Sequence, residues 1–308
     1  MDLLTIGSIA LDTVFVVTHI PTGHFGARIK HFGTYFGGRA PNVAAIAAKL
    51  GTKSGIYSLV GDDFESSGYR SHLDKLGVDL SGVTRIQGKK TVQIFIFVDE
   101  NNNQITFAYS DLLDHWKDLQ VPVELIRQTR LVHFTTGGNY LLNVDCAKNA
   151  TELGCAVSFD LGNDPVLEKT DYIRSMLPHV KYLFMNDLEA KKHVDRLGLK
   201  DPEDILNFGP QVVTTISISP ETHTHIFTRE GKIAVAHPIG SGEILIGASD
   251  AFVAGFLVGL SNGYELTECG RLGSVVSSFI RGAKGVQSKM PSWSQVSERY
   301  LKTFGSRI

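Results

Sequence analysis

Features that would place a protein in a specialised class are scarce in this sequence. Its 308 residues include 3 cysteines, Cys146, Cys155 and Cys269, and no two of them are spaced as a CxxC pair. An odd number without paired spacing argues against a disulfide framework and a zinc knuckle, and it favours a reducing cytoplasm. Lys and Arg total 30 against 32 Asp and Glu, so no excess of positive charge is present to attract a phosphate backbone. Nucleic acid is therefore not an expected partner.

Long apolar runs are missing as well. The run Ala251–Leu260 is far shorter than the ~18 to 20 residues that cross a bilayer. The apolar stretch Leu3–Val17 has no basic leader and is interrupted by Asp12. We expect no membrane partner, no secretion signal and a cytoplasmic location.

The familiar phosphate loops are also absent. The chain contains no G-x-x-x-x-G-K-[ST] sequence and no G-x-G-x-x-G after its first apolar run. P-loop and dinucleotide-binding interpretations therefore lose support.

The chain does contain short β-branched or aromatic runs that alternate with helix-length stretches. We predict strands at Leu3–Ile9, Gly55–Val60, Leu131–Thr135, Ala156–Phe159, Tyr182–Met185 and Val212–Ile218. We predict helices at Pro41–Leu50, Phe64–Leu76, Val144–Leu153, Asp187–Arg196, Ser249–Leu260, Leu266–Ile280 and Gln295–Thr303. Such alternation is typical of the α/β class, with a mainly parallel central sheet flanked by helices on both faces.

Two segments depart from this alternation because their strands follow one another without a helix. They are Thr13–Val17 with Ile29–Phe36, and Thr91–Val98 with Gln104–Tyr109. These pairs predict a small β-sheet outside the main one, over residues 13–36 and 91–109, which could act as a lid over a cleft. No linker or internal repeat marks a second unit, so we expect a single domain over residues 1–308.

The most informative stretch runs from Gly247 to Phe256, where small residues lead into an apolar helix with Asp250 at its start. Backbone N–H groups of a first turn lack partners within the helix and, with the helix dipole, form an anion site. Asp250 could accept a proton from an attacking hydroxyl while these groups stabilise a transferring phosphoryl. Alternatively, Asp250 only caps its helix, which contributes about 1 kcal/mol. A hydrolase with Ser249 as nucleophile is disfavoured, since no His and no Asp follows position 250.

A second polar group interrupts the apolar helix that follows the glycine pair Gly37-Gly38. Paired glycines permit a tight turn, and Pro41 suits the first turn of a helix. Asn42 is costly to bury there unless it finds partners, either a polyhydroxylated ligand or a neighbouring loop. Asp12 follows the first strand, where open α/β sheets bind ligands, although a turn role fits it equally well.

Together these residues resemble the ribokinase-like sugar and nucleoside kinases of the PfkB family. The family's two glycines followed by x-x-x-Asn are similar to Gly37–Gly51, and its Gly-Ala-Gly-Asp with Ala-Phe and Ala-Gly-Phe is similar to Gly247–Phe256. Asn186-Asp187-Leu188-Glu189 resembles its Asn-x-x-Glu motif. The order and spacing of these motifs extend the resemblance over almost the whole chain.

The resemblance implies a ribokinase-like fold and transfer of the γ-phosphoryl group of ATP to a hydroxyl of a sugar or nucleoside. It implies that Asp250 is the general base. It assigns the anion hole to Gly247, Ala248 and Ser249, the substrate hydroxyls to Asp12, Gly38 and Asn42, the nucleotide to Thr215 and Ser217, and Mg²⁺ to Asn186 and Glu189. In many relatives the lid pairs with a second subunit, so the resemblance also suggests a homodimer through the lid.

The sequence departs from the family pattern in two loops. Ile244-Leu245-Ile246 replaces the usual Asp-Thr-x, with Ser249 at the third glycine, and Thr215–Pro220 lacks both glycines of Thr-x-Gly-x-x-Gly. A serine Cβ needs room and disfavours positive φ, so the approach of the backbone to phosphate could be impaired or reshaped. Retention of Asp250 favours an active kinase. The replaced loops favour the alternative, a non-catalytic sugar- or nucleoside-binding paralogue with a degenerate phosphate loop.

The charge of the acceptor depends on Arg39, which lies in the glycine turn. This side chain could contact an anionic acceptor or face solvent. No Lys/Arg cluster accompanies it near the first signature, so we favour an unphosphorylated sugar or nucleoside.

Overall fold

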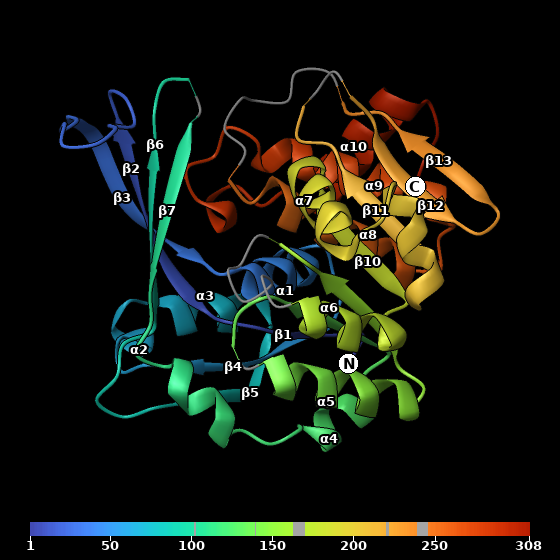
Figure 1. Cartoon of the computed structure of the whole chain (residues 1–308), viewed down its shortest axis with the longest axis horizontal. Helices are drawn as coiled ribbons and strands as arrows, with labels where there is room; N and C mark the ends of the chain where they lie inside the picture. The colour runs from blue at the N-terminus through green and yellow to red at the C-terminus, as the bar shows by residue number, and fades with distance from the viewer. Residues whose placement is uncertain (102, 139, 163–169, 220–221, 239–245) are drawn as a thin grey trace.

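The computed structural model describes residues 1–308 except 102, 139, 163–169, 220–221 and 239–245. Within the described residues the strands form a 9-stranded sheet and a separate 4-stranded sheet. Figure 1 shows the smaller sheet, formed by β2 (Ala10–Val17), β3 (Ile29–Gly37), β6 (Val92–Val98) and β7 (Gln104–Tyr109), at the left of the main body. The predicted α/β class, with a mainly parallel sheet and a small additional sheet, is confirmed.

The large sheet has the strand order β13-β12-β11-β10-β9-β8-β1-β4-β5. Its strands are β1 (Leu3–Ile6), β4 (Ser54–Val60), β5 (Asp79–Arg85), β8 (Leu131–Thr135), β9 (Ala156–Asp160), β10 (Tyr182–Asn186), β11 (Val212–Ile216), β12 (Thr224–Thr228) and β13 (Gly231–Val235). The pairs from β5 through β1 to β11 are parallel, whereas β12 and β13 run antiparallel at the edge. The strand order reverses at β1, which places a crevice at the carboxyl ends of its neighbours.

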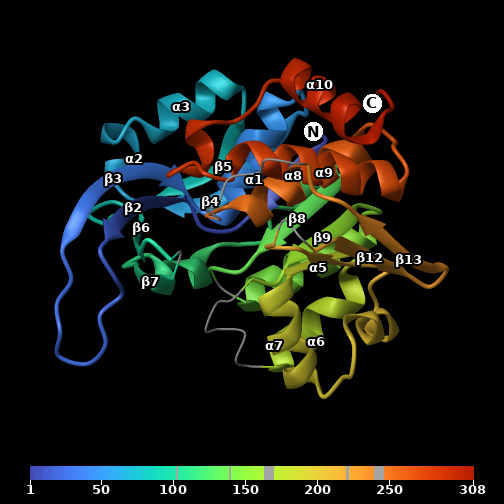
Figure 2. The same cartoon turned by 90° about the horizontal axis from the view of Figure 1, so that it is seen from above.

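Helices cover both faces of the large sheet with their apolar sides. On one face Phe184 and Val212 pack with Phe256 of α8 (Ala248–Ser261), and on the other face Val213 packs in the cluster that contains Val194 of α7 (Asp187–Leu197). The remaining helices are α1 (Arg39–Lys49), α2 (Asp63–Ser66), α3 (Tyr69–Leu76), α4 (Val123–Arg127), α5 (Tyr140–Glu152), α6 (Thr170–Met176), α9 (Leu266–Ile280) and α10 (Trp293–Phe304). Figure 2 shows α8, α9 and α10 on one side of the sheet and α5, α6 and α7 on the other.

Most predicted elements lie within a few residues of the observed ones, and one helix is divided. The helix predicted over Phe64–Leu76 is two helices, because Gly68 has φ +81° and begins α3 as its N-cap. A left-handed residue cannot continue a right-handed helix, so the chain turns there. No helix within the described residues combines the length and hydrophobicity that a membrane span requires.

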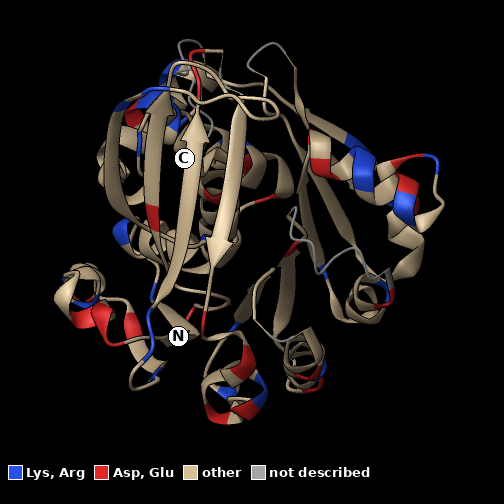
Figure 3. Ribbon diagram, turned by 60° about the vertical axis from the view of Figure 1, so that its left-hand side comes forward, with Lys and Arg blue, Asp and Glu red and all other residues tan. Residues whose placement is uncertain are grey.

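The 4-stranded sheet, which we call the lid, contains the two strand pairs predicted from the sequence. Strand β2 pairs antiparallel with β3 and parallel with β6, and β6 pairs antiparallel with β7. Side chains alternate between its faces, so Val14 and Ile96 are buried on one face with Ile246 packed against them. The opposite face, which we call the outer face of the lid, carries Phe15, Phe32, Phe97, Ile105 and Phe107. Figure 3 shows few charged residues along these strands.

Candidate active site

Helices α1 and α8 bring two of the predicted site residues into direct contact. Asn42 Nδ2 donates a hydrogen bond to Asp250 Oδ2 at 2.8 Å, although the residues are 208 positions apart. Asn42 is 3% exposed and Asp250 is 5% exposed. The buried amide on the apolar helix α1 therefore finds its partner in the carboxylate at the start of α8.

Asp250 does not cap its own helix. Gly247 is the N-cap of α8, with φ +69°, and no side chain among the described residues caps this helix. The first hydrogen bond of the turn runs from Ala251 N to Gly247 O at 3.0 Å. The N–H groups of Ala248 and Ser249 precede that bond, so the helix supplies them with no carbonyl partner. The capping interpretation is thus excluded, and the open first turn of α8 lies next to a carboxylate that contacts Asn42 of α1.

Gly247 is required by its backbone conformation and by close packing. A Cβ built on it would lie 2.0 Å from Val286 Cγ2, and left-handed backbone disfavours any other residue. Gly38, the N-cap of α1, has φ +93°, and a Cβ there would lie 2.4 Å from the backbone oxygen of Ser8. Both predicted glycines therefore form tight turns at the mouths of helices that carry polar site residues.

Arg39 connects Asp250 to a second buried carboxylate. Its Nη2 donates to Asp160 Oδ2 at 2.6 Å, and its Nε lies 3.5 Å from Asp250 Oδ1. Burial disfavours the charged guanidinium, but the charges of Asp160, Glu189 and Asp250 outweigh it and raise the pKa of Arg39. Arg39 thus has two carboxylate partners, and it neutralises part of an acidic cluster.

Burial shifts the carboxylates of the cluster toward their protonated forms. It raises the pKa of Asp250, while Arg39 and the hydrogen bond from Asn42 lower it by less. Burial also raises the pKa of Asp160 against the opposing charge of Arg39. A carboxylate whose pKa is raised and which has a defined donor beside it is suited to accept a proton from an alcohol.

Asp12 lies on β2 and faces the same cluster. Burial and the charge of Asp250 raise its pKa from 3.8 to about 7. Its Oδ1 is buried and has no hydrogen-bond partner within the described structure. A buried carboxylate oxygen without a donor is costly, and hydroxyl groups of a ligand would supply donors.

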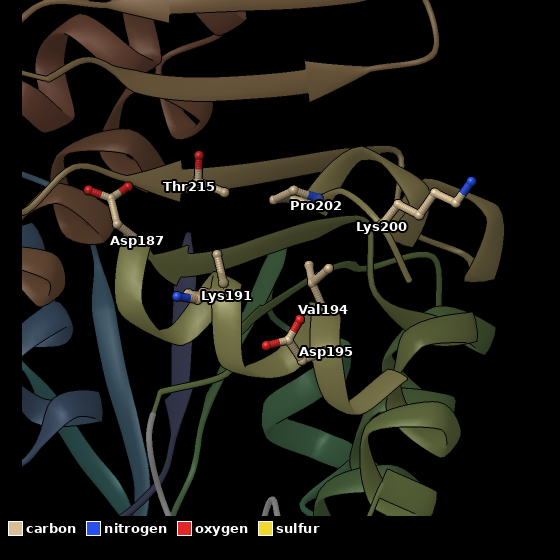
Figure 4. A pocket seen from close by; sticks show the side chains of 8 residues that line it. Asp187, Lys191, Val194, Asp195, Lys200, Pro202 and Thr215 are labelled. Carbon is tan, nitrogen blue, oxygen red and sulfur yellow. The ribbon is translucent and has the colours of Figure 1, made fainter. Parts of the chain in front are cut away.

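The nucleotide-side residues predicted from the sequence are divided between two places. Thr215 lines a pocket of about 270 Å³ with Asp187, Lys191 and Lys200, on the α7 side of the sheet (Figure 4). Asp250 belongs to α8, which packs on the opposite face. Ser217 lies beyond β11, where its Oγ donates to Ser219 O at 2.8 Å. The structure therefore does not bring Thr215 into the acidic cluster. Ile244, Leu245 and Pro220 lie outside the described residues.

Asn186 and Glu189, expected at a metal, form a capping box at the start of α7. Glu189 N donates to Asn186 Oδ1 at 2.9 Å, and Asn186 N donates to Glu189 Oε2 at 2.8 Å. The pattern Asn-x-x-Glu is also the sequence signature of such a box. The box uses the single side-chain oxygen of Asn186 and one of the two oxygens of Glu189, so Glu189 has the better remaining capacity to bind a cation.

Sequence reasoning missed several members of the site. Asp160 directly follows the predicted strand Ala156–Phe159, so the rule that selected Asp12 could have selected it. Arg39 was recognised as a charge in the glycine turn but not as the partner of two acids. Gln287 and Tyr69, which contact Asn42 or each other, follow no local pattern that marks them.

The chain belongs to the pfkB family of carbohydrate kinases, whose family model matches residues 1–293. It is a sugar or nucleoside kinase, and kinases of this family use ATP. It is 33% identical to the nucleoside kinase of Methanocaldococcus jannaschii over 96% of either chain. It is 27% identical to the cytidine kinase of Thermococcus kodakarensis, over 96% of this chain and 99% of that one.

Solved structures agree with the fold. The crystal structure of the M. jannaschii nucleoside kinase superposes with a TM-score of 0.87, at 32% identity, over 98% of this chain and 99% of that one. The structure of the Burkholderia thailandensis nucleoside kinase in complex with inosine has a TM-score of 0.88 at 23% identity, and the match covers 99% of this chain and 100% of that one.

Proposed function

We propose that this kinase transfers the γ-phosphoryl group of ATP to a hydroxyl group of a nucleoside, with Asp250 as the general base. The observation that carries the proposal is the contact of the Asp250 carboxylate with Asn42, beside the open first turn of α8. A nucleoside is favoured over a plain sugar because relatives that cover nearly the whole chain are named nucleoside kinase and cytidine kinase. Ribose and related sugars form the second acceptor class.

The residues of the cluster divide the work of the transfer. Asp12 and Asn42, with the Gly38 turn, would bind hydroxyl groups of the acceptor and place one of them beside Asp250. That hydroxyl gives its proton to Asp250 as its oxygen bonds to the γ-phosphorus, and the bond from this phosphorus to the bridging oxygen of ADP breaks. The N–H groups of Gly247, Ala248 and Ser249 would stabilise the negative charge on the transferring group.

The metal expected for such a kinase fits the residues only loosely. No group of three or more His, Cys, Asp or Glu side chains at metal spacing occurs in the described part of the chain. Magnesium keeps several waters and binds through few protein oxygens, so Glu189, directly or through water, with Asn186 beside it, would suffice. The ion would supply charge neutralisation at the phosphates of the nucleotide. Thr215 and Ser217 stay proposed contacts on the nucleotide side.

A substrate panel with an Asp250 variant tests this function. Mg-ATP is incubated with inosine, cytidine, other nucleosides and ribose, and formation of ADP and of the phosphorylated acceptor is measured. We expect Asp250→Asn to lose about 10²-fold or more in kcat, with acceptor binding little changed, since general bases contribute on that scale. The matched control is Asp171→Asn, which alters an exposed acid in the first turn of α6 and should retain wild-type turnover.

Two outcomes would contradict the proposal. If turnover by Asp250→Asn equals that of the wild type, another residue is the base. If nucleosides bind but ADP does not form above the Asp250→Asn level, the chain is the non-catalytic binding paralogue. The replaced loops around Ser217 and Ser249 are what would favour that second result.

We also infer a homodimer that buries the outer face of the lid. Phe32 is 63% exposed and Phe107 is 58% exposed, and Phe15 stacks on Phe32 and Phe97 with ring centroids 5.8 and 4.7 Å apart. Such a row of aromatic side chains on one sheet face is suited to contact an identical face.

The three free cysteines favour a cytoplasmic location.

A further inference from the structure

A run of hydrogen bonds extends from Asp250 away from the first turn of α8. Beyond the bond from Asn42 to Asp250, Gln287 Nε2 donates to Asn42 Oδ1 at 3.0 Å. The same Nε2 donates to Tyr69 Oη at 2.6 Å, and Tyr69 Oη donates to the backbone oxygen of Gly37 at 2.8 Å. Each of the four side chains is at most 6% exposed, so bulk water does not compete for these bonds.

The two ends of this run fix the direction of every hydrogen bond in it. The ionised carboxylate of Asp250 and the carbonyl of Gly37 can only accept. Asn42 must therefore point its NH₂ group at Asp250, which leaves its Oδ1 as an acceptor. Tyr69 must give its proton to Gly37, which leaves its oxygen as an acceptor. Both acceptors face Gln287, so the two hydrogens of its NH₂ group are both used.

We propose that Gln287 is a positioning residue that, together with the Asp250 carboxylate, holds the orientation of the Asn42 amide, and through it the placement of Asp250 and of the acceptor. The proposal rests on the proposed function for its kinetic consequences, but the orientation itself can be measured without turnover. Gln287 need not touch the substrate, because it acts through Asn42.

Close packing holds Gln287 in place. It lies in the short 3₁₀ helix Val286–Ser288, in which Val286 packs against Gly247. On the other side, a Cβ built on Gly285 would lie 2.5 Å from the ring of Tyr35, on lid strand β3. The backbone just before Gln287 is thus held between α8 and the lid.

Removal of the Gln287 NH₂ group would leave Asn42 Oδ1 buried without a donor. The orientation that points the Asn42 NH₂ group at Asp250 then carries the cost of a buried acceptor without a donor, so the turned amide, which presents its oxygen to the Asp250 carboxylate, is disfavoured by less than in the wild type. A hydrogen bond that lowers the pKa of Asp250 is replaced by repulsion, so this pKa rises. Asp250 interacts electrostatically with four other charged groups, Arg39, Glu189, Asp12 and Asp160. All four remain in the variant. His72, whose pKa burial lowers, lies beside Gln287.

The test compares three variants of the full chain. Gln287→Met keeps the length of the side chain without its hydrogen-bond donors. Gln287→Glu keeps the shape of the side chain but replaces the donating NH₂ group with an accepting oxygen. Ser288→Ala is the matched control, because Ser288 lies in the same 3₁₀ helix and its Oγ donates to the Gly285 carbonyl at 2.6 Å, away from Asn42. Each variant is assayed with Mg-ATP and inosine or cytidine over a range of pH. The carboxyl group of Asp250 is titrated by ¹³C NMR without substrate, and thermal unfolding monitors folding.

For Gln287→Met we expect KM for the nucleoside to rise about tenfold, which is the effect of losing one hydrogen bond to a charged group. KM for ATP should be unchanged. The acidic limb of kcat/KM and the NMR titration of Asp250 should both move to higher pH. Gln287→Glu should change both in the same direction, and it decides the question if Gln287→Met does not fold. Ser288→Ala should match the wild type.

An unchanged Asp250 titration in folded Gln287→Met would overturn the proposal. So would a parallel rise of both KM values without a shift of the pH profile, which is the mark of a general structural defect. A wild type that phosphorylates no acceptor would refute the proposed function alone, and the NMR titration would still decide the role of Gln287.

Discussion

Gly37→Ala is the substitution whose effect on acceptor binding follows most directly from the structure. A Cβ built on Gly37 would lie 2.0 Å from Oδ2, 2.1 Å from Cγ and 2.4 Å from Oδ1 of Asp12. All three distances are far below any real carbon contact, and Gly37 lies in paired backbone, opposite Ala10 of β2. The Asp12 carboxylate must therefore leave its position, because the strand cannot.

The size of the effect follows from what Asp12 would do there. A hydrogen bond from a neutral hydroxyl to a charged carboxylate contributes about 1.5 to 3 kcal/mol when it is desolvated. Since 1.4 kcal/mol is a factor of ten, KM for the nucleoside should rise by about 10- to 100-fold. KM for ATP should stay within about twofold, because Asp12 is not placed among the nucleotide contacts. The free energy of unfolding should change little, since a buried carboxylate with an unpartnered oxygen contributes no net stability to the folded state.

Gly33→Ala on the same strand is the matched control. A Cβ on Gly33 would meet Tyr35 Oη at 2.9 Å, the far end of a longer side chain that can move. Steady-state kinetics with both substrates should show wild-type constants for this variant. The double variant Gly37→Ala/Asp12→Ala should bind the nucleoside no worse than Asp12→Ala alone. A nucleoside KM within twofold of wild type for Gly37→Ala, or additive losses in the double variant, would refute the assignment of Asp12.

Two further predictions concern the lid and the effect of pH on stability. Phe107→Lys on the outer face of the lid should convert the dimer to a monomer, measured by sedimentation velocity. Leu301→Lys on α10 changes a residue that is also exposed and should leave the dimer intact. A wild-type protein that stays monomeric at high concentration would contradict the dimer. Because the pKa of Asp12 is about 7 in the folded protein and 3.8 ordinarily, the folded state holds a proton that the unfolded chain releases, so the free energy of unfolding falls as pH rises from about 4 to 7. Asp12→Asn should reduce this slope by up to about 1.4 kcal/mol per pH unit in urea unfolding and raise stability at pH 8, whereas the exposed Asp74→Asn should leave the slope unchanged.

The fold could be predicted because its signals are local. Strands β8 and β10 are buried on both faces, so they appear as short apolar runs between turn residues. Strand β13, at the edge of the large sheet, was missed, since most of its residues are exposed and it has no such apolar run. The division of the Phe64–Leu76 helix depends on one glycine, and a glycine inside a helical pattern does not by itself reveal its φ.

The site could be predicted only in part, because its contacts are long-range. Asp12, Asn42 and Asp250 were selected by their positions at strand ends and helix starts, and the structure places them in one cluster. Gln287 reaches Asn42 across 245 residues of sequence, and its partners are set by packing alone. Conversely, the Asn186 and Glu189 pair satisfies a local capping rule, so its pattern carries less information about a metal than the resemblance suggested.

The serines that replace family glycines weigh less against catalysis than the sequence suggests, because other groups hold the backbone at these positions. Thr224 Oγ1 accepts from Ser217 N at 3.0 Å, and Arg281 donates to the Ser217 and Ile218 carbonyls at 3.0 and 3.2 Å. Ser249 lies inside the first turn of α8, where helical φ is negative and a Cβ is tolerated. The position that does need positive φ is 247, where the glycine is retained. A left-handed glycine at the start of the first turn, beside a retained carboxylate, favours the kinase over the binding paralogue.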